Sequence, residues 1–224
     1  MKIICPLLAA GPLLFASLAA FAQNPPRATV QATGNASVSV TPDQAQITVS
    51  AITRAATAQD AANQNATVAS NIQGQLAQAL GTSGTVKTVG YSVNPDYSQG
   101  GNPVITGYTV TNTIQVILSD LSITGRIIDT ATQAGAGRID GLVFSLKDDT
   151  DARSQALRAA AQKAKAKADA MAASLGLKTG SVIAIQEAGA VIQPVTAGPT
   201  TAATPIQPGQ LNVTGNVTIA VELQ

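Results

Sequence analysis

The sequence predicts an α+β fold: largely antiparallel sheet or sheets, with about three helices packed on it, in the order ββαββαβα-β-long loop-β. Three observations predict this class. Apolar or small residues recur at every second position in several segments, which is the period of a strand. Other segments repeat apolar residues at the helical period. Turn-forming residues separate these segments, and closely spaced strands with interspersed helices favour antiparallel sheet covered on one face.

The first half of the chain is predicted to contain four strands and one helix. The strands show the alternating pattern and cover residues 28–40, 47–51, 86–93 and 104–118. The first two flank the turn sequence Thr41-Pro42-Asp43, so we expect them to form a β-hairpin. A helix is predicted over residues 58–80, because Thr57 can cap its start and Gly81 can end it. Asn94–Pro103 is dense in turn formers and is predicted to be a loop.

The second half is predicted to contain two helices and three strands. Asp120 can cap a short helix that Gly135-Ala136-Gly137 ends, and Asp149 or Thr150 can cap a longer one. The expected core stripe of the longer helix is Leu157, Ala161, Ala164, Ala168, Met171 and Leu175. The three strands are predicted over residues 139–146, 182–185 and 211–223. Residues 188–209, rich in Pro and Thr, are predicted to be a long loop.

The first 22 residues have the features of a secretory signal peptide. Lys2 precedes a short apolar stretch, and Ala20-Phe21-Ala22 forms an A-x-A cleavage site. We therefore predict cleavage after Ala22, export to the periplasm, and a mature domain over residues 23–224. About 200 residues suit one domain, or two small ones that share a core.

The mature composition excludes several classes of protein. The chain has no His, and its one Cys, Cys5, lies in the predicted signal peptide. A serine or cysteine triad, a His/Cys metal site and a redox thiol are therefore excluded, and no cofactor is expected. Without Lys2, the 13 basic residues become 12, equal to the 12 acidic ones, which argues against nucleic acid as a partner. No mature apolar stretch approaches the roughly 20 residues of a spanning helix.

A set of short motifs, in a fixed order, resembles a known family. The motifs are Gly34 to Ile47 around Pro42-Asp43, Gly107-Tyr108-x-Val110-x-Asn112, Gly135-Ala136-Gly137, the Ala/Lys repeat from Ala156 to Leu175-Gly176, and Gly180-x-Val182-x-x-Ile185-x-Glu187. Together they span Val30 to Leu223 and resemble the SIMPL-domain family, also called DUF541. The resemblance implies a periplasmic α+β protein without catalytic residues. It also implies a link to oxidative-stress tolerance or to envelope antigens, and self-association in some members.

Tyr97 is a candidate contact residue in the predicted loop Asn94–Pro103. A tyrosine in a flexible polar loop offers contact area at a small entropy cost, although it could equally fold back over the sheet edge. Gly107, Tyr108 and Asn112 are interpreted as a structural motif. We expect Tyr108 to pack inside the fold, and Asn112 to hydrogen-bond a neighbouring backbone segment.

The loop 188–209 is the second candidate contact element. It carries no charge, and its apolar groups lie among the prolines Pro194, Pro199, Pro205 and Pro208. Loops of this length without secondary structure are usually functional or disordered. We expect this one to dock on its own sheet edge or on a neighbouring subunit.

Two charged segments have simpler structural interpretations. Asp148-Asp149-Thr150-Asp151 lacks the spacing of a calcium loop and is interpreted as the acidic start of a helix, although its oxygens could bind a hard cation. Lys163, Lys165 and Lys167 are interpreted as a solvated helix face, with contact to anionic lipid or polymer as the alternative. No metal-binding residues are assigned.

Three functions remain open at this point. The first is a non-enzymatic envelope protein that acts by self-association or contact with another envelope protein. The second is a binding module for a small ligand or an envelope polymer, in a groove near the two long loops. The third is an enzyme that uses carboxylates, Lys and Tyr. Met171 is the only mature Met and is expected in the core, so any role in oxidative-stress tolerance should be indirect.

Overall fold

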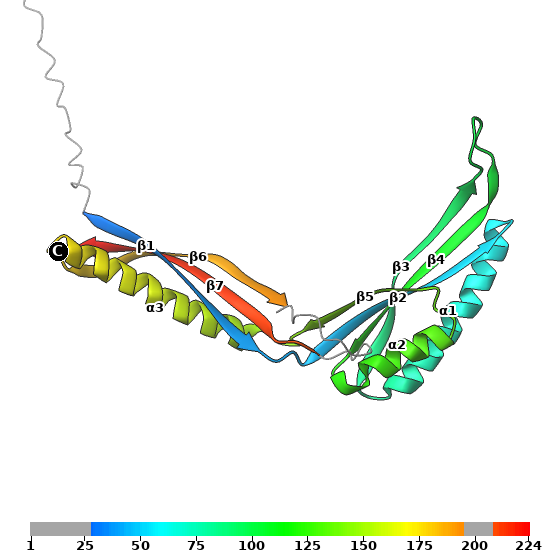
Figure 1. Cartoon of the computed structure of the whole chain (residues 1–224), viewed down its shortest axis with the longest axis horizontal. Helices are drawn as coiled ribbons and strands as arrows, with labels where there is room; N and C mark the ends of the chain where they lie inside the picture. Colours follow the sequence, from blue (N-terminus) through cyan, green and yellow to red (C-terminus); the bar gives the residue numbers. More distant parts are fainter. Residues whose placement is uncertain (1–27, 195–207) are drawn as a thin grey trace, which may run out of the picture.

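The computed structural model describes residues 28–194 and 208–224, which form two lobes joined end to end (Figure 1). Lobe A contains a sheet of order β1-β7-β6, and lobe B contains a sheet of order β3-β4-β2-β5. All the strand pairs are antiparallel. Helix α3 packs on the sheet of lobe A, and α1 and α2 pack on the sheet of lobe B. The predicted α+β class is therefore confirmed.

The observed elements follow the predicted order. The strands are β1 (Thr29–Val40), β2 (Gln44–Ala55), β3 (Gly84–Tyr97), β4 (Ile105–Leu118), β5 (Arg138–Ser145), β6 (Thr179–Pro194) and β7 (Leu211–Leu223). The helices are α1 (Ala58–Leu80), α2 (Thr124–Gln133) and α3 (Thr150–Ser174), and a 3-10 turn η1 (Leu121–Ile123) precedes α2. None of the helices in the described ranges is long and apolar enough to cross a membrane.

The predicted hairpin of the first two strands is wrong. β1 pairs with β7 along its whole length, from Thr29 opposite Glu222 to Val40 opposite Leu211. β2 instead lies between β4 and β5 in the other sheet. An alternating pattern fixes which face of a strand is buried but not its neighbour, and β7 offers twelve matching positions to β1. The turn at Thr41-Pro42-Asp43 thus links the two lobes.

Lobe B has a core of branched aliphatic side chains between its sheet and α1. Ile47, Ile72, Leu76 and Ile114 are fully buried there. The predicted bounds of α1 are confirmed: the Thr57 hydroxyl accepts a hydrogen bond from the Asp60 N–H at 3.1 Å, and Gly81 follows the last turn with a φ of 55°. The two ends of α1 are thus fixed by the capping residues that the sequence indicates.

Lobe A has a core in which α3 contributes only alanine. The buried positions of α3 are Ala152, Ala156, Ala160, Ala164, Ala168 and Ala172. Ala164 and Ala168 were expected there, and the predicted Leu157 and Ala161 are partly buried against the same core. The prediction is wrong for Met171, which is 40% exposed, and for Leu175, which is 71% exposed. Two glycines beneath the helix explain the difference. A Cβ on Gly34 would lie 2.1 Å from the Ala160 carbonyl oxygen, so α3 lies too close to the sheet for a larger residue.

Both predicted long loops are shorter than expected at the ends that the structure describes. β3 continues to Tyr97, and the Ser98 N–H donates to the Val104 oxygen at 2.8 Å, so residues 98–104 form the hairpin loop. β6 continues to Pro194, which lies opposite Leu211. Pro and Gly at these places end or interrupt a strand but do not prevent pairing at a sheet edge. Pro199 and Pro205 lie outside the described residues.

Candidate functional site

The hairpin formed by β3 and β4 brings together four of the candidate residues: Tyr97, Gly107, Tyr108 and Asn112. Figure 1 shows this hairpin extending beyond α1 at the far end of lobe B. Tyr108 lies opposite Pro95, and Tyr97 lies opposite Ile105. The residues singled out by the sequence therefore belong to one structural unit.

Gly107, which lies opposite Asp96 near the outer end of the hairpin, allows β4 and β2 to approach closely. A Cβ on this buried residue would lie 3.0 Å from the carbonyl oxygen of Ala55 on β2. A side chain here would push β4 away from β2. The close contact between β4 and β2 at this position therefore requires a residue without a side chain.

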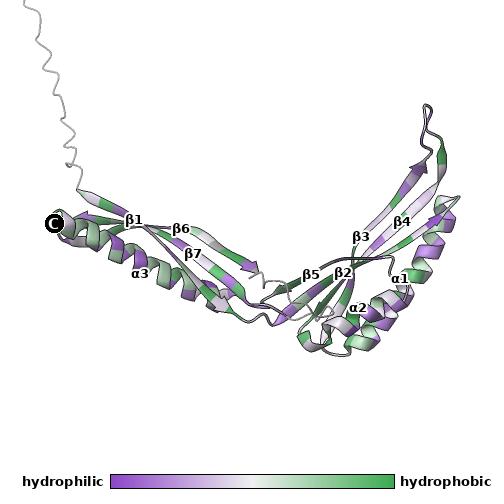
Figure 2. Ribbon diagram, viewed as in Figure 1, coloured by the Kyte–Doolittle hydropathy of each residue, from purple (hydrophilic) through white to green (hydrophobic). Residues whose placement is uncertain are grey.

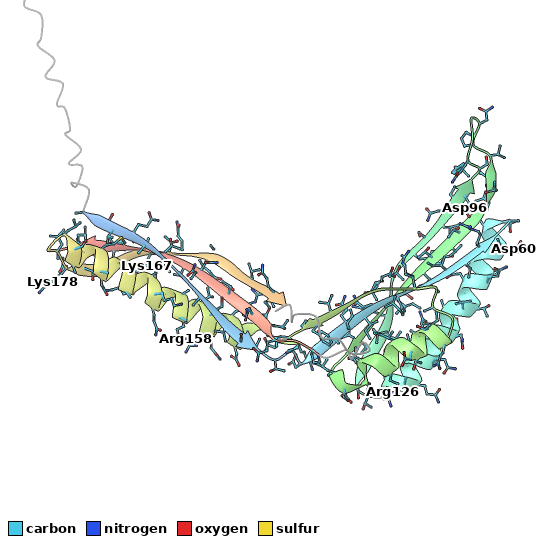
Figure 3. All side chains as sticks on the ribbon, viewed as in Figure 1. Asp60, Asp96, Arg126, Arg158, Lys167 and Lys178 are labelled. Atoms are coloured by element: carbon cyan, nitrogen blue, oxygen red, sulfur yellow. The ribbon has the colours of Figure 1, made fainter. Side chains whose placement is uncertain are left out.

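An ion pair fastens the hairpin to β2. The Arg54 Nε lies 2.8 Å from Asp96 Oδ2 and donates to Thr109 Oγ1 at 3.1 Å. The Thr109 hydroxyl donates in turn to Asp96 at 2.8 Å. Asp96 is labelled in Figure 3 near the outer part of the hairpin. These bonds orient the segment immediately before Tyr97.

All three tyrosines of the chain lie on this hairpin, and two of them face solvent. Tyr91 and Tyr97 are each 56% exposed, whereas Tyr108 is half-buried, as its predicted packing role requires. We define the hairpin patch as its exposed large apolar residues: Val89, Tyr91, Val93, Tyr97, Val104 and Ile105. Tyrosine and valine side chains at such positions provide contact area at low entropy cost.

Tyr91 was predicted only as part of a strand and not as a contact residue. One signal could have found it: every tyrosine falls between positions 91 and 108 of the 224 residues. Such local clustering of amphipathic aromatic residues is typical of contact surfaces. The prediction for Tyr97 also changes, because this residue lies at the end of a strand rather than in a loop.

The expected role of Asn112 is carried out by Asn65. The Asn65 Nδ2 donates to the carbonyl oxygens of Ala51 at 3.0 Å and Val110 at 3.3 Å, tying α1 to β2 and β4. Asn112 lies opposite Ala51, but its buried Oδ1 has no hydrogen-bond partner among the described residues. Asn65 interrupts the apolar pattern of its helix because its side chain forms these buried hydrogen bonds to β2 and β4.

A second polar network, with only Ser50 fully buried, lies on the opposite face of the lobe B sheet. The buried Ser50 hydroxyl donates to Asp140 Oδ2 at 2.5 Å, and Arg138 forms an ion pair with the same carboxylate. Burial would raise the pKa of Asp140, but the hydrogen bonds from Ser50 and Arg138 outweigh it and hold the pKa below its usual value. At neutral pH this carboxylate is therefore ionised and bound to the Ser50 and Arg138 side chains.

A cleft at the junction of the lobes was not predicted from the sequence. It has a volume of about 520 Å³ and is lined mainly by apolar side chains. The principal lining residues are Leu142, Phe144 and Leu146 from β5 and its end, Ile192 from β6, and Leu211 from β7. Asp149 supplies a carboxylate at its rim, ion-paired to Arg153 at 2.7 Å. The arrangement suits an apolar ligand body.

The acidic segment at the start of α3 and the lysines along this helix have the structural roles predicted from the sequence, an acidic helix start and a solvated face. Asp148 accepts from the Thr150 N–H at 2.9 Å, and its hydrogen bonds with Thr150 lower its pKa. Within residues 28–194 and 208–224, no group of three acidic side chains could hold a metal ion. Lys165 pairs with Asp169 at 2.5 Å, whereas Lys167 donates to the Thr33 oxygen at 2.9 Å, so neighbouring lysines point to different sides of the helix.

Comparison with known proteins agrees with the motif order. Residues 30–221 match the family model SIMPL, described as a protein of unknown function (DUF541). The chain is 26% identical over 181 residues to the 26 kDa periplasmic immunogenic protein of Brucella melitensis biotype 1, covering 76% of this chain and 72% of the relative. The protein of the same name from Brucella abortus strain S19 matches to the same extent. The chain, whose motifs and two-sheet α+β structure extend over this whole range, belongs to the SIMPL (DUF541) family.

Proposed function

We propose that the protein is a non-enzymatic envelope protein that acts through protein–protein contact, with the hairpin patch as its contact surface. The observation that carries this proposal is the concentration of exposed aromatic residues on one projecting hairpin. Exposed apolar clusters of this kind are typical of interaction sites. The partner is a second copy of the chain or another envelope protein.

A periplasmic location is part of the proposal. The names of the two Brucella relatives and the features of residues 1–22 support it. The signal peptide is removed after Ala22, and residues 23–224 form the mature protein with its Pro/Thr-rich segment at 188–209. Mass measurement of the protein recovered from the periplasm tests this location. A mass that includes residues 1–22 would contradict it.

The role in oxidative stress is indirect, but the reason differs from the expected one. Met171 was expected in the core, yet it is 40% exposed and open to oxidation. A single methionine forms one sulfoxide per chain and cannot turn over peroxide unless it is reduced again. Purified protein with added peroxide should therefore consume no more than one equivalent. Sustained turnover would contradict an indirect role.

Site-specific photocrosslinking tests the contact surface in the intact envelope. A photoreactive residue at Tyr97 should give a discrete protein adduct, because this side chain lies at the outer end of the hairpin. The matched control is Ala66, an exposed position on α1, which should give none. Equal adducts at both positions, or none at Tyr97, would contradict the proposal.

A binding role for a small apolar ligand is the second candidate, and the junction cleft favours it. Its walls are apolar, and one of them includes Leu211, which lies opposite Pro194 of the predicted long loop 188–209. Replacing Leu142 by Gln would polarise the wall and should abolish binding of an apolar fluorescent probe.

Deletion of residues 194–205 tests whether this neighbouring segment is a contact element. Loss of assembly would support that role, and unchanged assembly would return the contact role to Tyr97.

A further inference from the structure

The walls of the junction cleft come from both lobes. Leu142 and Phe144 of β5 pack against the core of lobe B, whereas Leu146 and Ile192 pack against a small buried cluster of lobe A. In Figure 1 the ends of β5 and β6 and the start of β7 meet between the two lobes. Each wall thus continues the core of its own lobe, and a ligand in the cleft contacts both lobes at once.

The chain itself joins the lobes through a narrow connection. Two segments cross from one lobe to the other, residues 41–43 and 146–149. Asp43 fastens them together: its N–H donates to the Ser145 oxygen at 3.2 Å, and its Oδ1 accepts from the Lys147 N–H at 2.7 Å. Within the part of the chain that the structure describes, the extensive contacts between helices and strands all lie inside one lobe or the other. The angle between the lobes therefore depends on this connection and on contacts across the cleft beside it.

The cleft is apolar, and its one charge is balanced. Its volume of about 520 Å³ lies in the range of small-molecule sites. Among the lining residues that the structure describes, Asp149 is the only charged one, and its Oδ2 lies 2.7 Å from the Arg153 Nε. Ser145 and Gln210 supply uncharged hydrogen-bonding groups. A charged ligand meets no unbalanced opposite charge on these walls, so an uncharged ligand loses less on leaving water.

The side chains of the walls favour an aliphatic ligand over an aromatic one. Leucine and isoleucine make up most of the large apolar lining, and Phe144 is the only aromatic residue among the described lining residues. An aromatic ligand gains from offset or edge-to-face contact with other rings, and one half-buried ring offers little of this. A hydrocarbon chain needs only apolar area, which both walls provide.

We propose that the junction cleft binds an uncharged amphiphile with one aliphatic chain, a monoacylglycerol for example, and that the bound molecule fixes the angle between the lobes. The inference rests on the second candidate function, ligand binding in this cleft, and adds the ligand class and its effect. The chain packs between Phe144 and Leu211, and the hydroxyl head hydrogen-bonds to the exposed Gln210 amide. A ligand that contacts both walls stabilises the lobe arrangement to which it binds best.

A displacement assay tests the ligand class. The probe is N-phenyl-1-naphthylamine, an uncharged dye that becomes fluorescent in apolar surroundings. Monolauroylglycerol should displace it at lower concentration than dodecanoate or dodecylamine, which have the same chain length but a charged head. Gln210→Leu should weaken monolauroylglycerol binding about threefold to tenfold, the effect of one lost hydrogen bond, and leave the probe unaffected. Equal displacement by all three compounds would overturn the uncharged class.

Two neighbouring positions on β6 locate the site. Ile192 lines the cleft, whereas Val191, the preceding residue, does not line it and is 51% exposed. Ile192→Gln should weaken probe binding about tenfold or more, because it places an amide in the apolar wall, and Val191→Gln should bind like the parent chain. Circular dichroism checks that both variants are folded. Equal loss in both variants, or in neither, would overturn the location of the site.

The effect on the lobes is measured between two spin labels. The predicted mature chain has no cysteine, so Gln78→Cys on α1 and Gln155→Cys on α3, both at exposed positions, place one label in each lobe. Pulsed electron resonance should give a distance distribution that narrows when monolauroylglycerol is added. The same labels with Ile192→Gln should show no narrowing. A distribution that is unchanged at saturating ligand would overturn the effect on the lobe angle.

The remaining outcomes separate this inference from the candidate function on which it rests. Absence of probe binding to the parent chain would overturn both. Probe binding without preference for the uncharged head, or without narrowing, would overturn the inference and leave ligand binding in place. Probe binding by the variant that lacks residues 194–205, but not by the parent, would show that the chain's own segment occupies the cleft and would overturn both. The hairpin patch is tested independently, by the crosslinking at Tyr97.

Discussion

The two lobes share a layout, a sheet with helix on one face, but fill the space between helix and sheet differently. In lobe B, α1 contributes Ile72, Leu76 and Leu80 to an aliphatic core. In lobe A, α3 contributes alanine at every fourth position from 152 to 172, above Gly34 and Gly215. Close packing is reached by large side chains in one case and by close approach of the backbone in the other. Figure 2 shows hydrophobic and hydrophilic bands along the helices of both lobes, so hydropathy does not by itself separate the two cores.

This difference shows why a weakly amphipathic helix can still have a well-defined buried face. On α3 the larger residues Met171 and Leu175 are excluded from the face by lack of room, although hydrophobicity alone favours them. Contacts between elements are concentrated within each lobe. We therefore expect each lobe to respond to mutations in its own core, and the following predictions use that expectation.

The largest effect is expected for Gly34→Val in lobe A. The new Cβ would lie 2.1 Å from the Ala160 oxygen and 2.4 Å from the Ala164 nitrogen, and backbone atoms of a helix cannot move aside. The cost should reach or exceed the upper end of the about 1–3 kcal/mol typical of overpacking. Hydrogen exchange should show α3 and β1 unprotected and α1 still protected. Protection of both lobes would contradict the close-approach account.

A cavity in lobe B is expected to have the next largest effect. Ile72 is fully buried against the sheet, so Ile72→Ala should cost about 2–5 kcal/mol of unfolding free energy. Hydrogen exchange should now increase in α1 and β2 and stay unchanged in α3. Uniform loss of protection would show that the lobes unfold as one unit.

Loss of the Asn65 hydrogen bonds is expected to lower the free energy of unfolding by a smaller amount. Asn65→Ala removes hydrogen bonds to the Ala51 and Val110 oxygens and should cost about 1–2 kcal/mol. Gln64→Ala, at the neighbouring exposed position, is the matched control and should be neutral. Denaturant unfolding measures both. Equal costs would indicate that helix propensity rather than the buried amide is responsible.

Substitution of a helical glycine that has no close neighbours should change stability slightly, and in the opposite direction to the substitutions above. No atom lies within 4 Å of a Cβ added to Gly74, in the middle of α1, in contrast to Gly34. Gly74→Ala should stabilise lobe B by about 0.5–1 kcal/mol, because alanine loses less backbone entropy in a helix. The melting temperature should rise slightly. A fall would indicate an unseen contact at this surface.

The smallest effect is expected for the stability of lobe A at acidic pH, which depends on Asp169. Hydrogen bonds from Lys165 and Thr179 hold the pKa of Asp169 below its ordinary value. A lowered pKa in the folded state contributes stability that is present above the unfolded value of about 3.9 and is lost as the pH falls through the folded value. Asp169→Asn should therefore melt slightly lower than the parent at pH 7, and the difference in melting temperature should narrow as the pH falls below about 3.9. A difference that does not change with pH would assign it to shape rather than charge.

The sequence by itself determined the order of the elements and, where a cap or a clear alternation marks them, their ends. Thr57 and Gly81 bound α1 as predicted, and alternation located β7 within its observed limits. These features are local, because caps and alternation act between residues close in the chain. The motif Gly107-Tyr108-Asn112 was also placed correctly on one strand, since its position depends only on the pattern around it.

Tertiary structure decided which residues that are distant in the sequence pack against one another. The partner of β1 is β7, about 180 residues away, and no local pattern distinguishes it from β2. The alanine face of α3 is set by glycines on two other strands, and the buried amide tie belongs to Asn65 because its helix crosses Ala51. The junction cleft likewise exists only once the two lobes are assembled, because β5 of one and β6 and β7 of the other line it. Local chemistry fixes the elements, whereas the available space and the neighbouring backbone fix their packing.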